Sequence, residues 1–117
     1  MRDLIEQYLA CWNEADPAKR RELIGETWAD DGSYTDPLAD VRGHDQIDAV
    51  IAAAQEQFPG LSFALTGPVD SHHRQARFAW GLGQGGGEPV AEGSDVAVTG
   101  PDGRLSAVFG FLDKVPG

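Results

Sequence analysis

The segment Phe58-Pro59-Gly60-Leu61-Ser62-Phe63-Ala64-Leu65 divides the chain into two parts with different hydrophobic periods. Before it, apolar residues recur at steps of three and four, the spacing of one helix face. After it, apolar residues alternate with small or polar ones, as in strands with a buried face. Helices followed by strands are typical of an α+β domain, and this class is therefore predicted.

Three helices are predicted before Pro59. Asp16-Pro17 pairs an N-cap residue with a proline in the first helical position, and the helix that begins there should end near Trp28. Gly43 opens a third helix, and Pro59-Gly60 ends it. We expect Lys19-Arg20-Arg21 to form a solvent-exposed face, because charged side chains are rarely buried. The apolar stripes of the first and third helices comprise Leu4, Ile5, Tyr8, Leu9 and Trp12, and Ile47, Val50, Ile51, Ala54 and Phe58.

Five strands are predicted. Asp30-Asp31-Gly32 should end the second helix, and a short extended piece follows at 33–36. The other four strands cover about 61–66, 77–82, 89–99 and 104–114, with glycine-rich turns at 84–87 and 100–103. The predicted order is α-α-β-α-β-β-β-β in a single domain, residues 1–117.

Composition excludes several classes of function. Nine Lys and Arg against nineteen Asp and Glu give a net charge of −10 over 117 residues, which argues against nucleic acid and against an anionic membrane surface. A single cysteine, Cys11, rules out an intrachain disulfide and a cysteine metal cluster. The longest nearly apolar stretch, 49–54, is too short to span a bilayer, and the N-terminus does not read as a signal peptide. We therefore expect a cytoplasmic protein.

The last two strands are apolar on both faces. Val96 and Val98 face one way and Ala97 the other, and in the final strand Leu105, Ala107, Phe109 and Phe111 oppose Val108 and Leu112. So short a chain has helices for only one face of the sheet. We expect a second copy of the chain to cover the other face, giving a homodimer.

Three side chains are candidates for chemistry. Tyr8 lies on the apolar face of the first helix, Asp36 precedes Pro37, and Asp95 is an acid inside an otherwise apolar strand. Each also has a simpler structural explanation: core packing for the tyrosine, a turn for Asp36, and an exposed or salt-bridged position for Asp95.

Taken together, these residues and their surroundings resemble a known family. Glu6-Gln7-Tyr8-Leu9-Ala10-Cys11-Trp12-Asn13, the segment 28–37 (WADDGSYTDP) and Gly93-Ser94-Asp95-Val96 are similar to segments of ketosteroid isomerases. The whole chain resembles a SnoaL-like domain of the nuclear-transport-factor-2-like superfamily, which also includes polyketide cyclases. The resemblance implies a cone-shaped barrel of three helices on a curved, mainly antiparallel sheet that encloses one apolar pocket.

The resemblance also implies roles for individual residues. Asp36 would be the base that moves a proton, and Tyr8 and a protonated Asp95 would donate hydrogen bonds to the oxygen on which negative charge develops. Trp80, Val108 and Leu112 match pocket positions, and Trp12 and Trp28 are further candidates for ligand contact. The orientation of Asp95 is open, because the larger residues Val96 and Val98 have the opposite parity.

The function predicted is binding of a small apolar molecule, with acid–base isomerisation or cyclisation of a carbonyl compound and without a cofactor or metal. The alternatives are a non-catalytic carrier or sensor of an apolar molecule and a structural dimer module. His72-His73 lacks a third ligand for a metal, and Gly85-Gly86-Gly87 lacks the lysine of a phosphate loop. Cys11 has no nearby histidine to activate it, so an inert packed thiol is expected.

Overall fold

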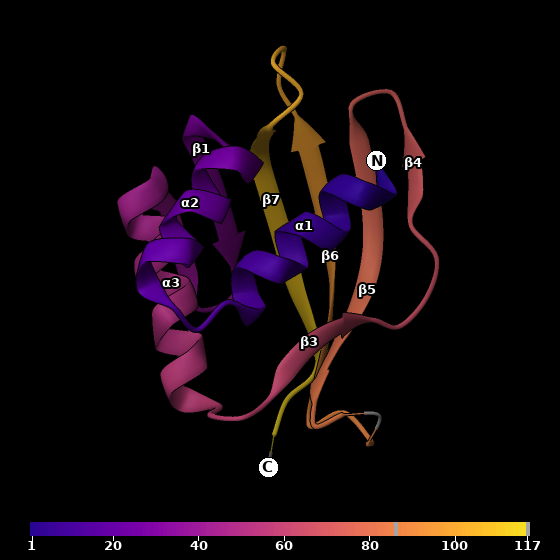
Figure 1. The fold of residues 1–117 in the computed structure, drawn as a ribbon. Coiled ribbons are helices and arrows are strands. Elements are labelled where there is room, and N and C mark those ends of the chain that lie inside the picture. The colour runs from indigo at the N-terminus through magenta and orange to yellow at the C-terminus, as the bar shows by residue number, and fades with distance from the viewer. Residues whose placement is uncertain (86, 117) are drawn as a thin grey trace.

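The computed structural model describes residues 1–85 and 87–116. In this part of the chain, three helices pack on one face of a curved seven-stranded sheet (Figure 1). The helices are α1 (Arg2–Asn13), α2 (Pro17–Thr27) and α3 (His44–Gln57). The strands are β1 (Trp28–Asp36), β2 (Ala39–Arg42), β3 (Ser62–Leu65), β4 (Asp70–His72), β5 (Gln75–Gly83), β6 (Ala91–Thr99) and β7 (Leu105–Lys114).

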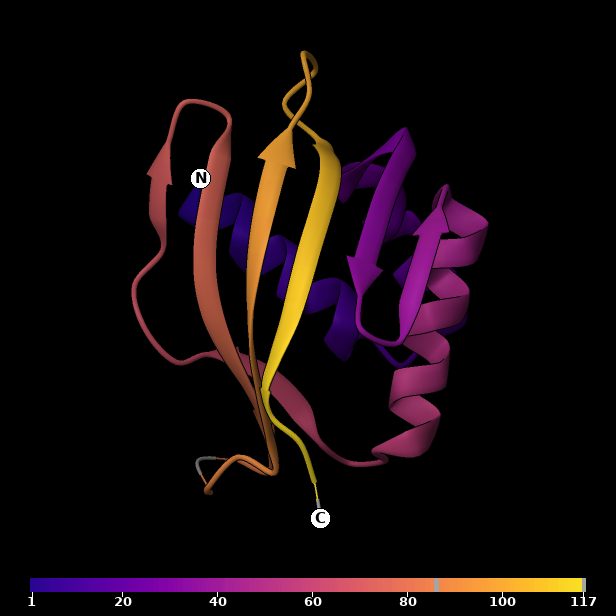
Figure 2. The same cartoon turned by 180° about the vertical axis from the view of Figure 1, so that it is seen from behind.

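The sheet is mostly antiparallel. Its order is β2-β1-β7-β6-β5-β3, with β4 also paired to β5, and β1 runs parallel to β7. The predicted α+β class with three helices on a mainly antiparallel sheet is thus confirmed. The sheet does not close into a barrel, since β2 and β3 remain edge strands. Seen from behind, the outer face of the sheet is not covered by any helix of the described residues (Figure 2).

Two strands, β2 and β4, were not predicted. Asp36 creates β2 by reversing the chain: its Oδ1 accepts the backbone N–H groups of Leu38 and Ala39, both at 2.8 Å. The returning segment then pairs antiparallel with β1. The alternation of apolar and polar residues in β2 covers only four residues, and β4 contains no apolar residue, so the periodicity signal is weak for β2 and absent for β4.

The predicted end of the second helix near Trp28 is confirmed, but the strand that follows it begins earlier than the predicted position 33. The helix ends at Thr27, and β1 begins at Trp28. The acidic residues lie instead in an irregularity where the pairing of β1 with β7 shifts between Trp28 and Ser33. Gly32 is required there, since a Cβ would lie 2.7 Å from Trp28 Cδ1.

Arg20 corrects a second prediction, that of a solvent-exposed basic run. Lys19 and Arg21 are exposed, but Arg20 is only 5% exposed. Its Nε donates to Asp48 Oδ1 on α3 at 2.6 Å, and it also donates to Gln55 Oε1 at 3.0 Å. The charge is tolerated because it is paired and hydrogen-bonded, and the network joins α2 to α3.

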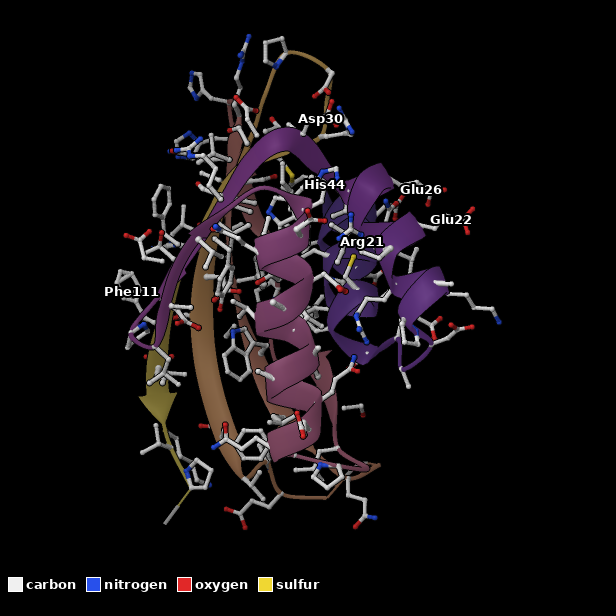
Figure 3. All side chains as sticks on the ribbon, turned by 90° about the vertical axis from the view of Figure 1, so that its left-hand side faces the viewer. Arg21, Glu22, Glu26, Asp30, His44 and Phe111 are labelled. Atoms are coloured by element: carbon white, nitrogen blue, oxygen red, sulfur yellow. The ribbon has the colours of Figure 1, made fainter. Side chains whose placement is uncertain are left out.

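The core lies between the helices and the inner face of the sheet. Leu105 was expected on the same face of the last strand as Phe109 and Phe111, but it is fully buried in this core. The reason is a register shift between Val98 and Thr99, which turns the start of β7 inward. Phe109 and Phe111 do lie on the outer face, 43% and 56% exposed, and Figure 3 shows Phe111 pointing away from the helices. In the described residues, no helix has the length and apolar character needed to cross a membrane.

Candidate functional site

A cavity of about 390 Å³ lies between the helices and the inner face of the sheet. Side chains from α1, α3, β1, β3, β5, β6 and β7 line it, and most of them are apolar. Leu38 and Val115, 81% and 60% exposed, are among the lining residues and are also in contact with solvent. Asp36 and Asp95 are the two carboxylates of its lining.

Asp95 is held at the inner wall by two donors. The Tyr8 hydroxyl donates to Asp95 Oδ2 at 2.8 Å, and the Trp80 indole N–H donates to Oδ1 at 3.2 Å. Asp95 is 3% exposed, and this burial raises its pKa to about 6, even though both hydrogen bonds act to lower it. Burial also raises the pKa of Tyr8 well above its ordinary value, and the neighbouring Asp95 adds to the effect.

The orientation of Asp95 follows from the small residues of β6. On the inner face of this strand, Asp95 lies between Gly93 and Ala97, while the larger valines face outward. The Trp80 ring fills the space above Gly93, where a Cβ would overlap Trp80 Cζ2. The inner face of β6 is therefore the core face, although its own residues are small, and Asp95 faces the cavity.

Asp36 stabilises the turn between β1 and β2 and also lines the cavity. Its Oδ1 holds the turn into β2, and its Oδ2 accepts the hydroxyl of Tyr34 at 2.6 Å. Both oxygens thus act as acceptors, an arrangement that suits a carboxylate. Burial, the nearby Asp95 and the hydrogen bond to Asp36 raise the pKa of Tyr34.

The two acid–tyrosine pairs meet over Gly110 of β7. A Cβ placed on this glycine would lie 2.9 Å from Asp95 Oδ1, 3.3 Å from Asp36 Cβ and 3.5 Å from the Tyr34 hydroxyl. Gly110 is also the register partner of Asp95 across the β6–β7 pair. The absence of a side chain here allows the two carboxylates to face the same small volume.

Aromatic rings form a continuous wall between the two acids. Trp12 contacts Tyr34 and Phe63 at ring-centroid distances of 5.2 and 5.4 Å, and Phe63 contacts Trp80 at 5.2 Å. Trp12 also packs against Tyr8, at 6.4 Å. Among the described residues, the buried indole N–H of Trp12 has no hydrogen-bond partner.

Most of the residues singled out in the sequence line this cavity: Tyr8, Trp12, Asp36, Trp80, Asp95 and Leu112. Trp28 and Val108 do not. Both are fully buried in the core, where Trp28 packs behind Tyr8 at a ring distance of 5.3 Å. Tyr34 was missed, although its place two residues before Asp36 puts both side chains on one face of an extended strand.

The remaining candidates lie elsewhere. His72 and His73 are exposed, with their Nδ1 atoms 2.9 Å apart, and neither lines the cavity. The described residues contain no cluster of three or more potential metal ligands. Cys11 is buried, which raises its pKa to about 11. The turn predicted at 84–87 includes Gly86, which lies outside the described residues.

Comparison with known proteins agrees with this architecture. The SnoaL-like domain model matches residues 5–108. A proposed isomerase of the SnoaL-like family from Agrobacterium tumefaciens str. C58 is 43% identical, with 95% of each chain covered and a TM-score of 0.89.

Two more distant structures share the fold. A proposed SnoaL-like polyketide cyclase from Jannaschia sp. CCS1 is 20% identical, with coverage of 94% of this chain and 85% of that one and a TM-score of 0.71. An NTF2-like protein of unknown function from Exiguobacterium sp. 255-15 is 16% identical, with 94% and 98% covered and a TM-score of 0.74. The comparison with curated proteins finds no match. From the family match and the shared fold, the chain belongs to the SnoaL-like family of the NTF2-like superfamily.

Proposed function

We propose that the chain binds a small, largely apolar carbonyl compound and catalyses an isomerisation or an aldol-type cyclisation of it by general acid–base chemistry. One observation carries the proposal: two acid–tyrosine pairs, Tyr34–Asp36 and Tyr8–Asp95, converge over Gly110 inside an apolar cavity. Acids in different environments within one pocket are the usual basis for separate acid and base roles.

In this proposal Asp36 is the base. Its carboxylate takes a proton from the carbon next to the carbonyl, and the electron pair of the broken C–H bond moves into an enolate. Isomerisation is completed when Asp36 returns the proton to a different carbon. In cyclisation, the enolate carbon instead bonds to a second carbonyl carbon, and the oxygen of that carbonyl takes up the proton.

Asp95 and Tyr8 would stabilise the charge that develops on the enolate oxygen. A carboxyl group with a pKa of about 6 is protonated far more readily than an ordinary aspartic acid, so Asp95 is suited to donate a hydrogen bond. When Asp95 is protonated and donates to Tyr8, the Tyr8 hydroxyl becomes free to donate to the ligand.

The related Agrobacterium protein supports this direction, because it is described as a proposed isomerase and is 43% identical over nearly the whole chain. Cyclic enones and β-diketones form the test panel. They are incubated with the protein in deuterated water, and exchange of the hydrogen next to the carbonyl is followed. Acceleration for at least one bound compound is expected, and no acceleration for any bound compound would contradict catalysis.

A non-catalytic carrier is the second candidate, favoured by one observation. Asp36 holds the β1–β2 turn through two backbone hydrogen bonds, so its presence has a structural reason apart from catalysis. A carrier needs only the apolar cavity and one orienting polar group. Binding without accelerated exchange would identify it.

For assembly, we propose a cytoplasmic homodimer formed through the outer face of the sheet. Phe109 and Phe111 are exposed on this face, and no helix covers it (Figures 2 and 3). Exposed apolar surface of this kind is typical of an interface between copies of a chain. A dimer would serve the enzyme and the carrier equally, and it would be the main feature of a purely structural module.

A further inference from the structure

The two carboxylates of the cavity lack a positively charged partner. In the described residues, neither Asp36 nor Asp95 takes part in an ion pair, and the cavity lining contains no Lys, Arg or His. The Arg and Lys side chains that do form ion pairs have partners elsewhere, such as Asp48 for Arg20 and Asp70 for Arg77. A positively charged group that enters the cavity would therefore meet two carboxyl groups and no competing cation among the described lining residues.

The aromatic side chains that line the cavity also favour a positively charged group. Tyr34, Trp12, Phe63 and Trp80 form an unbroken aromatic series, with Asp36 beside its first ring and Asp95 hydrogen-bonded to its last. Aromatic rings attract ammonium groups through their negative faces, most strongly where water is excluded. An anion would meet the opposite conditions: two acids, no cation, and a net charge of −10 on the chain.

We propose that this cavity is a binding site for small organic cations, meaning apolar compounds that carry a quaternary or protonated amine. The ammonium group lies between the aromatic wall and the Asp36–Asp95 pair, and the apolar remainder of the compound fills the cavity toward Leu82 and Leu112. This selectivity rests on the cavity and not on the proposed proton transfer. If both hold, the substrate is a carbonyl compound that also carries an amine.

Two probes of the same shape separate charge from apolar burial. Phenyltrimethylammonium and tert-butylbenzene differ only in that a positively charged nitrogen replaces a carbon, and benzoate provides an anion. Binding to the full chain is measured at pH 7.5 by tryptophan fluorescence, with calorimetry for the soluble salts. Phenyltrimethylammonium should bind at least about tenfold more tightly than tert-butylbenzene, and benzoate should not bind.

Single substitutions test whether the preference for the cation depends on the acids of the cavity. Asp95→Asn should reduce the preference for the cation by about tenfold while leaving the affinity for tert-butylbenzene within about twofold of wild type. Asp36→Asn gives a second measurement if Asp95→Asn fails to fold. Asp3→Asn removes the same charge from the exposed start of α1 and should change neither affinity.

The proposal is overturned if tert-butylbenzene binds wild type as tightly as phenyltrimethylammonium, if neither compound binds at millimolar concentration, or if Asp3→Asn lowers the preference as much as Asp95→Asn. These probes contain no carbonyl group, so their binding is independent of deuterium exchange. Cation binding without exchange would reject the proposed catalysis alone, and exchange without cation preference would reject this inference alone.

Discussion

Tyr8 and Asp95 are 87 residues apart in the sequence, and a 2.8 Å hydrogen bond joins their side chains inside the fold. The contact connects the first helix to a central strand of the sheet. It also gives a buried acid one of its two donors, the other being Trp80. The properties of this acid determine several measurable consequences.

Asp95 should make stability depend on pH. Its pKa in the fold, about 6, lies above its ordinary value of 3.8, so folding favours the protonated form. The stabilisation is complete below about pH 4 and is lost as the pH rises through 6. Relative to Asp95→Asn, wild type should lose about 2 kcal/mol of unfolding free energy between pH 4 and pH 7.5. Urea unfolding at the two pH values measures this, and a difference that does not change with pH would contradict it.

Tyr8→Phe should raise the pKa of Asp95 above about 6, because it removes a donor that stabilises the carboxylate. A carbon-13 NMR titration of the Asp95 carboxyl group measures the change. The lost hydrogen bond should also cost about 1 kcal/mol of stability. An unchanged or lower pKa in the variant would show that Tyr8 does not act as a donor to Asp95.

Gly110→Ala should disrupt the site, because it adds a methyl group where Asp36 and Asp95 approach each other. The added Cβ would be 2.9 Å from Asp95 Oδ1 and 3.3 Å from Asp36 Cβ, so the two acids must separate. We expect stability to fall by about 1–3 kcal/mol and ligand affinity to fall with it. Gly25→Ala is the matched control: it lies within α2, has no atom within 4 Å of the added Cβ, and should stabilise the fold by about 0.5–1 kcal/mol. Equal effects of the two substitutions would contradict the close approach over Gly110.

Arg20 and Arg21 are neighbours with opposite environments. Arg20→Leu leaves Asp48 and Gln55 without their donor in a half-buried network, and should destabilise the fold by about 3 kcal/mol. Arg21→Leu removes a pair with the exposed Asp45, and should cost less than about 1 kcal/mol. Thermal unfolding compares them. Similar losses would mean that the Arg20 network does not hold α2 to α3.

The oligomeric state in solution tests the proposal that the outer face of the sheet forms a dimer interface. Sedimentation at micromolar concentration should show a dimer, with an interface of about 1,200–2,000 Å² in total. Phe111→Ser should shift the equilibrium toward the monomer, while Val90→Ser, at an exposed position before β6, should not. A 12.5 kDa species alone for wild type would refute the dimer.

The sequence was sufficient to predict the fold class, because the change from helical to strand periodicity at Pro59-Gly60 is local and strong. It was not sufficient for β2, which exists because Asp36 bonds to the backbone of the residues after Pro37. The inward position of Leu105 depends on a register shift that no periodicity records.

The candidate site, too, was predicted only in part, because some of its geometry depends on contacts between residues far apart in the sequence. Tyr8, Asp36 and Asp95 line one cavity, as the resemblance implied. The direction of Asp95 could not be read from β6 itself, because the large side chains that fill the core above Gly93 come from other elements, Trp80 above all. The burial of Arg20 likewise depends on Asp48 and Gln55, which lie 28 and 35 residues further along the chain.

Asp36→Asn tests the central claim most directly. The amide keeps the shape of the carboxylate but is a far poorer base, so an uncharged carbonyl compound that wild type binds and exchanges should still bind within about threefold, while its deuterium exchange slows by about 10²–10⁴-fold. Asp40→Asn makes the same change on the exposed side of the same hairpin and should exchange as fast as wild type. If Asp36→Asn binds the compound and exchanges it as fast as wild type, Asp36 is not the base and the proposed mechanism is wrong.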